Sequence, residues 1–235
     1  YDSQPFSGSG HLLFQTKTQD IFWQNQLTTD YGTGIAGLSH TTQKLKVDTV
    51  DYDQTKRTTK SAWLGYNLDQ NRHHLQLNGR LDDVSDVGHY TTGAINYGFD
   101  LTQAWRVFAG YSNGFTAPSF NYLYYPYSGN AKLKAEKATY AQAGVQYAQK
   151  NYGARVTYFE THYRDKIVSS AATYWIPYNV DRARVQGVEL HGWYNQNGWN
   201  VDAGVTYQEV RNRADQSLLI RQPRILANLS VSKAW

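Results

Sequence analysis

Two amphipathic segments of the chain are joined by a long tyrosine-rich segment in the stretch FTAPSFNYLYYPYSGNAKLKAEKATYAQAGVQY (Phe115–Tyr147). The first amphipathic segment, Trp105–Tyr111, runs up to this stretch, and the second, Thr139–Tyr147, forms its end. Long aromatic loops held between two strands are typical of binding surfaces on a rigid scaffold. The stretch therefore predicts two β-strands connected by a functional loop.

Strict alternation of apolar and polar residues is the main signal along the rest of the chain. Trp105, Val107 and Tyr111 point to one face of a strand, whereas Arg106 points to the other. The same period of two recurs from end to end, so the chain is predicted to be all-β, with about eleven strands. The predicted strands span residues 12–28, 33–47, 58–68, 72–82, 90–99, 103–115, 136–148, 152–166, 181–194, 199–212 and 222–235.

The connections between these strands alternate between short and long. The short ones are residues 29–32, 69–71, 100–102, 149–151 and 195–198, and the long ones are 48–57, 83–89, 116–135, 168–180 and 212–221. In an up-and-down meander this places every long loop at one end, which is the plan of an antiparallel transmembrane β-barrel. A soluble sandwich or propeller also alternates, but its outer face is charged. Here the apolar face carries Trp105, Tyr111, Trp199 and Tyr207 near strand ends, as interfacial aromatic girdles do.

Composition agrees with a barrel and excludes other classes. Among 235 residues there are 20 Tyr, 7 Trp and 19 Gly, and the mean hydropathy is −0.65. No apolar run approaches the roughly 18 residues that a membrane helix needs. Cysteine is absent, which excludes disulfides and thiolate metal sites. The net charge of +4 is spread along the chain, without the basic block that would indicate nucleic-acid binding.

Two predicted strands follow the alternation poorly. Around Ala154–Asp165 both faces are mixed, because Val156 and Tyr158 compete with Phe159. Either a β-bulge or an upper half that rises above the membrane would explain this. The alternation is similarly weak at Thr41–Lys46.

A family resemblance is carried by several segments in order. FTAPSFNYLY, beginning at Phe115, resembles the F-x-A-P-x-x-x-x-L-Y segment of TonB-dependent outer-membrane transporters, and NAKLKAEKATYAQAGVQY resembles their N-P-x-L-x-P-E-x-S-x-x-x-E-x-G stretch. YFETHYRDKIV, YNVDRARVQGVELHGWY and RQPR are similar to the signatures that follow. The chain departs from the pattern at Ala131, Ala135 and Gln142, which replace two Pro and one Glu.

The resemblance implies a bacterial outer-membrane protein that is surrounded by lipid. Such proteins fold as a monomeric barrel of about 22 strands around a plug domain that contacts TonB. The chain begins without Met and shows neither plug, TonB box nor closing terminal strand. We therefore expect residues 1–235 to be a middle to C-terminal portion of the barrel domain. Lumen-facing residues expected to contact the plug are Arg80, Arg106, Gln142, Glu189 and Asp202.

The sequence gives little evidence for a catalytic site or a metal site. The seven histidines form no spaced metal pair on one strand face, and a G-x-S-x-G nucleophile motif is absent. Two acidic loop clusters, Asp48–Asp53 and Asp82–Asp86, have the chemistry for calcium but no defined ligand spacing. We expect no enzyme activity and no cofactor, and calcium is unsupported.

The aromatic loops hold the best candidates for ligand binding. Tyrosine offers a flat apolar face and a hydroxyl, which suit a large, partly polar ligand. Loop packing or an aromatic girdle would use the same residues. Arg221 matches the position of a substrate-contacting arginine in the cobalamin transporters of this family, although a lumen salt bridge is an equal alternative. The candidate residues are Asn121, Tyr122, Tyr124, Tyr125, Tyr127, Trp175, Tyr178 and Arg221.

The short loops and the run SLLIRQPR favour cobalamin as the transported molecule, through the resemblance to the cobalamin transporters. A siderophore or haem is the alternative within the family. A small passive porin, an outer-membrane enzyme or an adhesin is the alternative from another class, and it has no need of the transporter signatures.

Overall fold

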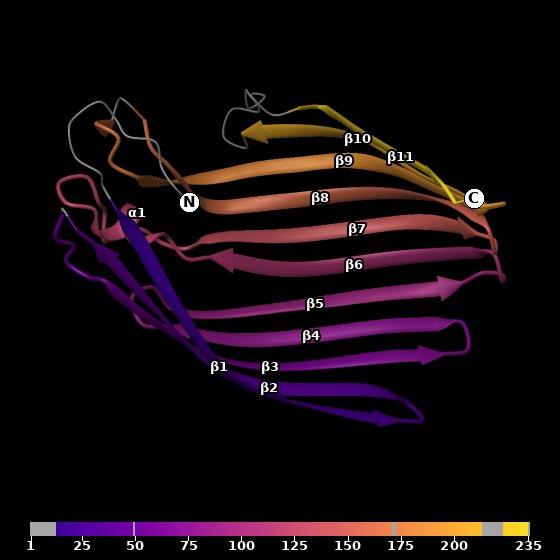
Figure 1. Cartoon of the computed structure of the whole chain (residues 1–235), viewed down its shortest axis with the longest axis horizontal. Helices are drawn as coiled ribbons and strands as arrows, with labels where there is room; N and C mark the ends of the chain where they lie inside the picture. The colour runs from indigo at the N-terminus through magenta and orange to yellow at the C-terminus, as the bar shows by residue number, and fades with distance from the viewer. Residues whose placement is uncertain (1–12, 49, 171–172, 213–222, 235) are drawn as a thin grey trace.

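The computed structural model describes residues 13–48, 50–170, 173–212 and 223–234. Within them the chain forms one antiparallel sheet of eleven strands and a single short α-helix (Figure 1). The elements are β1 (Phe14–Thr29), β2 (Gly32–Val47), β3 (Lys56–Gln70), β4 (His73–Val84), β5 (Gly88–Asp100), β6 (Trp105–Thr116), α1 (Phe120–Tyr124), β7 (Glu136–Ala148), β8 (Tyr152–Val168), β9 (Tyr178–Gln196), β10 (Trp199–Asn212) and β11 (Ile225–Lys233).

The strands lie in the sheet in the order in which they occur in the sequence, and each pairs with the next. This confirms the predicted meander. The tight turns after β1, β3, β5, β7 and β9 gather at one end of the sheet, and the connections after β2, β4, β6 and β8, together with α1, gather at the other (Figure 1). The connection after β4 consists only of residues 85–87, so the long loop predicted for 83–89 is wrong, because both strands continue into it. The described residues contain no helix that is long and apolar enough to cross a membrane.

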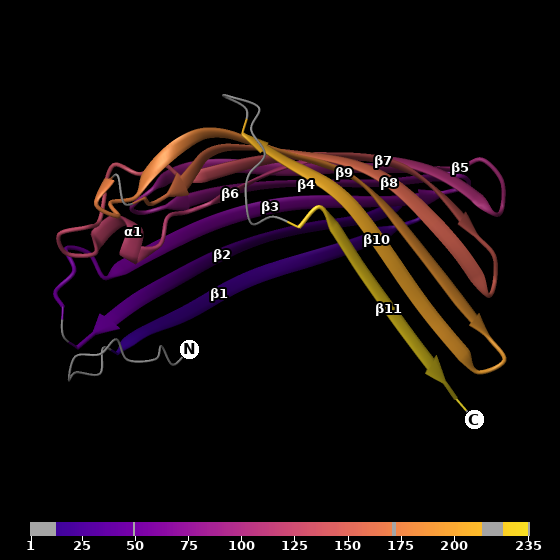
Figure 2. The same cartoon turned by 90° about the horizontal axis from the view of Figure 1, so that it is seen from above.

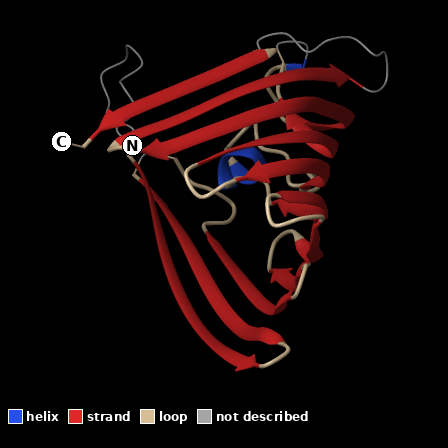
Figure 3. Cartoon of the chain, turned by 90° about the vertical axis from the view of Figure 1, so that its right-hand side faces the viewer, coloured by secondary structure: helices blue, strands red, loops and turns tan. Residues whose placement is uncertain are grey.

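The sheet is strongly curved, and its two faces have opposite chemistry (Figure 2). In β6 the apolar Trp105, Val107 and Tyr111 are exposed, whereas Arg106 and Gly110 are half-buried. The helix α1 lies in the hollow of the curve (Figure 3), and the buried side chain of Arg57 contacts its Phe120, which identifies the polar face as the concave one. An apolar convex face and a polar concave face are expected of a membrane barrel.

Tyrosine hydroxyl groups mark both edges of the apolar band. On the side of the long loops, Tyr158 and Tyr207 donate hydrogen bonds to Glu160 (3.4 Å) and Glu209 (3.2 Å), each two residues farther out. On the side of the tight turns, Tyr194 donates to Gln196 at 3.2 Å. Each ring can thus lie against lipid while its hydroxyl reaches the polar boundary, as in the aromatic girdles of barrels.

Cross-strand pairs of glycine and an aromatic residue explain the mixed pattern of β8. The Phe159 ring lies across its register partner Gly187, where an added Cβ would meet ring atom Cζ at 2.7 Å. Phe108 covers its partner Gly144 in the same way. The glycines leave room for inward-facing rings, so an apolar side chain on the concave face does not disturb the strand.

Of the two explanations for β8, the structure favours a polar upper half. The register with β7 is unbroken from Ala148–Gly153 to Lys137–Arg164, so the segment has no bulge on this side before Asp165, where φ is 55°. Beyond Tyr158 the convex face carries ionic groups: Glu160 forms salt bridges with Arg184 (2.8 Å) and His162. This half of the strand therefore extends past the apolar band.

The structure also shifts several predicted boundaries. β8 continues to Val168 and β9 begins at Tyr178, so the long loop predicted for residues 168–180 is reduced to 169–177. β3 begins at Lys56, within the predicted loop 48–57. The start of β3 is polar on both faces, and β8 ends in the adjacent apolar residues Ile167 and Val168, so neither end shows the alternation on which the sequence prediction depends.

Replacing Val205, which is 48% exposed on the convex face, with Arg should destabilise the barrel by about 1–3 kcal/mol, a cost between that of arginine at the bilayer midplane and at its interface. The matched change Thr206→Arg faces the lumen beside Glu189 and should cost much less. Urea unfolding of the full-length protein in lipid vesicles measures both. Equal destabilisation would contradict the assignment of the two faces.

Candidate functional site

The long loop between β6 and β7 is a compact structure that packs on the upper concave side of the sheet. Ser119 caps α1, with its Oγ accepting a hydrogen bond from the backbone N–H of Tyr122 at 3.2 Å. The apolar side chains of the loop are turned inward, which gives it a small core of its own. This core consists of Pro118, Phe120, Leu123, Leu133 and Ala135, all of which are buried.

A buried ion pair fixes the base of this loop. The Arg57 guanidinium on β3 donates to both carboxylate oxygens of Asp86, at 2.7 and 2.8 Å, and their side chains are 8% and 1% exposed. The same guanidinium donates to the carbonyl of Pro118 at 2.8 Å and lies 5.0 Å from the centroid of the Phe120 ring. One charged group on β3 thereby joins the β4–β5 connection to the β6–β7 loop.

Three of the predicted ligand-binding residues take part in this packing. Tyr124 donates to Asp86 at 3.4 Å, and its pKa is raised by burial and by the negative charge of that carboxylate. Asn121 accepts a hydrogen bond of 2.7 Å from the phenol of Tyr52, and Tyr125 meets the Tyr52 ring edge-on with centroids 5.8 Å apart. These residues form the support of the loop surface.

The far end of the loop is tied to the connection between β8 and β9. Asn130 donates to the carbonyl of Pro177 at 2.9 Å. The Asn179 amide accepts from the backbone N–H of Lys134 at 2.9 Å and donates to its carbonyl at 3.0 Å. A third bond, of 2.6 Å, joins this amide to the carbonyl of Asp165. The β6–β7 loop and the β8–β9 connection therefore form one surface.

Aromatic side chains at the tips of these two loops are open to solvent. Tyr127 is fully exposed, Trp175 is 67% exposed and the neighbouring Tyr174 is 86% exposed. All three have positive φ angles, of 67°, 64° and 51°, which bulky residues rarely adopt. Such strained positions concentrate at ligand-binding sites. Tyr122 (42% exposed) and Tyr178 (37% exposed) lie at the margins of this surface.

The predicted candidates therefore divide into an exposed and a packed group. Tyr122, Tyr127, Trp175 and Tyr178 are accessible, whereas Tyr124 and Tyr125 are half-buried and support them. Asn121 is exposed but is held by its hydrogen bond with Tyr52. Arg221 lies outside the described residues. Sequence reasoning missed Tyr174, next to Trp175, and the supporting residues Arg57, Asp86 and Tyr52.

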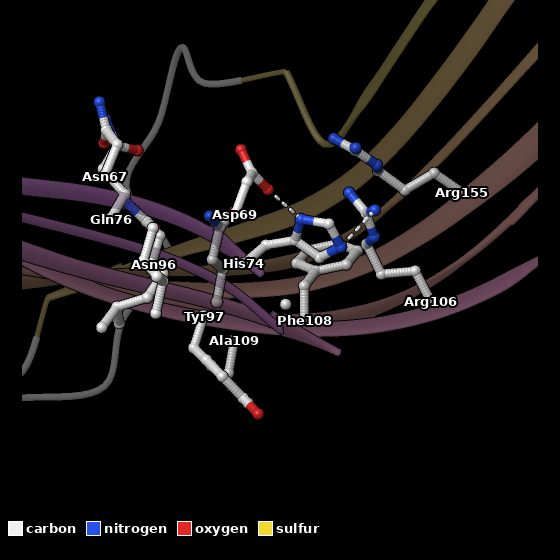
Figure 4. Close-up of a pocket in the computed structure, with 14 residues that line it drawn as sticks. Asn67, Asp69, His74, Gln76, Asn96, Tyr97, Arg106, Phe108, Ala109 and Arg155 are labelled. Carbon is white, nitrogen blue, oxygen red and sulfur yellow. Dashed lines mark hydrogen bonds and ion pairs between the residues drawn. The ribbon is translucent and has the colours of Figure 1, made fainter. Parts of the chain in front are cut away.

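The concave face holds a polar hollow of about 570 Å³ near the tight turns (Figure 4). His74 lies at its centre and contacts Asp69, Asp100 (2.8 Å) and Arg106 (2.7 Å). Arg155 is aligned beside Arg106, with its guanidinium 5.0 Å from the Phe108 ring centroid. Tyr97 and Ala109 point in the opposite direction. The hollow offers charged and amide groups to whatever fills the lumen.

The acidic clusters noted in the sequence do not converge in the described chain. Asp82 binds Arg80 and Ser61 (2.9 and 2.6 Å), Asp83 pairs with His89 at 3.1 Å, and Asp86 pairs with Arg57. Within the described ranges no group of three His, Cys, Asp or Glu residues is placed to hold a metal ion. The geometry adds no support for a calcium site.

Comparison with known proteins identifies the family. Residues 1–235 match the family model described as TonB dependent receptor-like, beta-barrel. The chain belongs to this family. It is accordingly a portion of an outer-membrane receptor barrel of Gram-negative bacteria, as the sequence signatures predict.

Two curated relatives are vitamin B12 transporters. The protein BtuB of Vibrio vulnificus is 28% identical over 74% of this chain, and that of Photobacterium profundum is 26% identical over 89%. The chain spans only 29% and 36% of their respective lengths.

Solved structures of siderophore receptors share the fold. PirA from Acinetobacter baumannii has a TM-score of 0.79 and 16% identity over 98% of this chain and 42% of its own. PirA from Pseudomonas aeruginosa has a TM-score of 0.72 and 21% identity over 84% of this chain and 41% of its own.

Removing the central cation by Arg57→Ala should release the β6–β7 loop. The Asp86 carboxylate, 1% exposed, would lose its partner, and breaking a buried pair from one side costs about 3–5 kcal/mol. Amide hydrogen exchange of residues 117–135 should therefore accelerate, while Lys56→Ala at the exposed neighbouring position should leave it unchanged. Unchanged exchange in Arg57→Ala would contradict the central role of the pair.

Burial, reinforced by the neighbouring Tyr125, raises the pKa of Tyr52 from 10.0 to about 12. Because the folded pKa is the higher one, the protonated phenol stabilises the loop fully below pH 10 and loses this effect as pH rises through about 12. The difference in tyrosinate absorbance between the unmodified protein and Tyr52→Phe should titrate near 12. A midpoint near 10 would show that Tyr52 is not buried against Tyr125 in solution.

Proposed function

We propose that the full-length protein is a TonB-dependent, energy-coupled importer and that its cargo is cobalamin. The observation that carries the cargo is the similarity to two proteins named vitamin B12 transporters, across 74% and 89% of the chain. The exposed aromatic tips fit this proposal, because flat apolar faces with polar margins suit a large, partly polar ligand.

In the proposed mechanism the loops capture the ligand from outside the cell. The packed base of the loop surface, with the Arg57–Asp86 pair at its centre, keeps the exposed aromatic residues in a fixed arrangement before the ligand arrives. Further strands complete the barrel in the full-length protein, and a plug domain fills its lumen until TonB pulls on it. The polar concave face, including the hollow around His74, would contact this plug. Binding and gated passage require no covalent chemistry.

A siderophore is the second candidate, because the solved structures with the same fold include siderophore receptors. Their identity of 16–21% to this chain supports the architecture more than the cargo. Haem has no comparable support. A passive porin fits the family match poorly, since a porin needs no energy coupling.

The cargo is tested with purified full-length receptor and cyanocobalamin. Tyr127→Ser and Trp175→Ser should each weaken binding about tenfold, since a buried aromatic contact contributes roughly 1–2 kcal/mol. Both residues are exposed in the free protein, so the fold should be unaffected. Tyr31→Ser, an equally exposed position in a tight turn at the opposite end, serves as the matched control.

Fluorescence titration measures the affinity of each variant. Arg221→Ala, titrated in parallel, tests the contact implied by the family resemblance. Absence of cyanocobalamin binding, together with clear binding of a ferric siderophore, would replace the first candidate by the second.

A further inference from the structure

The backbone ladder between β5 and β6 opens before either strand ends. The register runs from Asp100–Arg106 only as far as Gly93–Asn113, although β5 begins at Gly88 and β6 continues to Thr116. The Asn113 side chain closes the ladder: its Oδ1 accepts from the N–H of Gly93 at 2.7 Å, and its Nδ2 donates to the carbonyl of Thr91 at 2.9 Å. The wall is therefore split above this point.

This opening forms a hollow of about 280 Å³, which we call the cationic cleft. The Tyr90 ring stacks on the Phe115 ring across it, with centroids 4.1 Å apart and planes within 10°. The exposed side chains of Lys137 and Arg164 line the same cleft, and the Lys137 ammonium lies 5.9 Å from the Tyr90 centroid. Lys137 and Arg164 are register partners on β7 and β8, so their side chains are neighbours on the convex face.

The charge of these two residues is not neutralised within the described chain. The two histidines that line the cleft have carboxylate partners: His89 contacts Asp83, and His162 contacts Glu160. Neither Lys137 nor Arg164 forms a salt bridge with any described carboxylate. Two adjacent, unpaired cations beside an aromatic floor favour an anion that is attached to an apolar body.

A second hollow, of about 510 Å³, lies beside the cleft on the convex face, and we call it the apolar hollow. Its lining is almost entirely hydrocarbon, and Gly79 deepens it because the glycine leaves open space around the position of a Cβ. The register connects the hollow to Thr91, which also lines the cleft. Its principal walls are Trp23, Leu38, Ala62, Leu64 and Leu81.

The two hollows lie at different depths in the membrane. Leu38 and Leu81 are six and eight residues from the tight-turn ends of their strands, whereas Lys137 and Arg164 are eleven and twelve residues away. For strands tilted by about 40°, these separations correspond to heights of roughly 15–20 Å and 28–30 Å. The tyrosines that mark the outer edge of the apolar band, Tyr158 and Tyr207, are six and eight residues from the same ends, so the apolar hollow reaches this edge and the cations lie beyond it, on the headgroup side.

We propose that the apolar hollow and the cationic cleft together bind one membrane lipid with a phosphate-bearing headgroup. An acyl chain occupies the hollow over Gly79, and the phosphate lies between the Lys137 ammonium and the Arg164 guanidinium. Both cations donate charge-assisted hydrogen bonds to phosphate oxygens. The recess around Gly79 provides the shape that distinguishes a bound lipid from the fluid lipid around the rest of the barrel.

Native mass spectrometry of the full-length receptor, released from detergent after incubation with phosphatidylglycerol, tests this proposal. The receptor should retain one lipid, and inorganic phosphate or diacylglycerol should not displace it. The double change Lys137→Gln and Arg164→Gln should lower the retained fraction about tenfold by removing both charge-assisted contacts. The control is the double change Lys44→Gln and Lys46→Gln. It removes the same charge from exposed positions on β2, at the end of the sheet that carries the long loops.

The apolar half is tested separately by Gly79→Phe, whose ring fills the hollow without a clash at Cβ. This change should also release the lipid. Gly192→Phe is the matched control, because Gly192 lies outside both hollows and an added Cβ there meets only the carbonyl of Gly153, at 3.7 Å.

Two results would overturn the proposal. Equal lipid retention by all four variants would mean that the face is covered by fluid lipid only. Loss of retention in the Lys137 and Arg164 variant alone, with displacement by inorganic phosphate, would mean a phosphate site without a lipid chain.

Discussion

The structure depends on one constraint: each strand must satisfy its backbone polar groups through its neighbours while its two faces meet different surroundings. An unpaired backbone group costs several kcal/mol in hydrocarbon, which makes a continuous ladder obligatory across the apolar band. The unbroken register from β6 to β10 meets this requirement. The alternation of side chains then sends Val107 and its counterparts toward lipid, and Arg106 and its counterparts toward the lumen.

This constraint is relaxed at the end of the sheet that carries the long loops, and the candidate functions lie there. Above the tyrosine girdle the convex face becomes ionic, as Glu160 and Arg184 show, and the ladder between β5 and β6 can end at Asn113. On the concave side a single buried pair, Arg57–Asp86, organises loops from distant parts of the sequence. A rigid scaffold thus supports a surface whose exposed aromatic tips are free to meet a ligand.

The order and class of the strands could be predicted from the sequence because period-two patterning is a local property that lipid enforces strongly. A boundary such as Val168 could not be, since β8 ends in the polar run Arg164–Lys166 followed by the adjacent apolar residues Ile167 and Val168, without alternation. Tyrosine enrichment indicated the loop surface, but it did not separate Tyr127, which is exposed, from Tyr124, which supports it. That distinction depends on Arg57 and Asp86, 29 residues apart in the sequence and without a local motif.

A cryo-electron microscopy structure of the full-length receptor with cyanocobalamin tests the central claim most directly. The account predicts ligand density against Tyr127 and Trp175, with the Arg57–Asp86 pair and the base of the β6–β7 loop unchanged. A ligand bound elsewhere, or a loop base that rearranges to expose Tyr124 and Tyr125 to it, would contradict the division between supporting and binding residues.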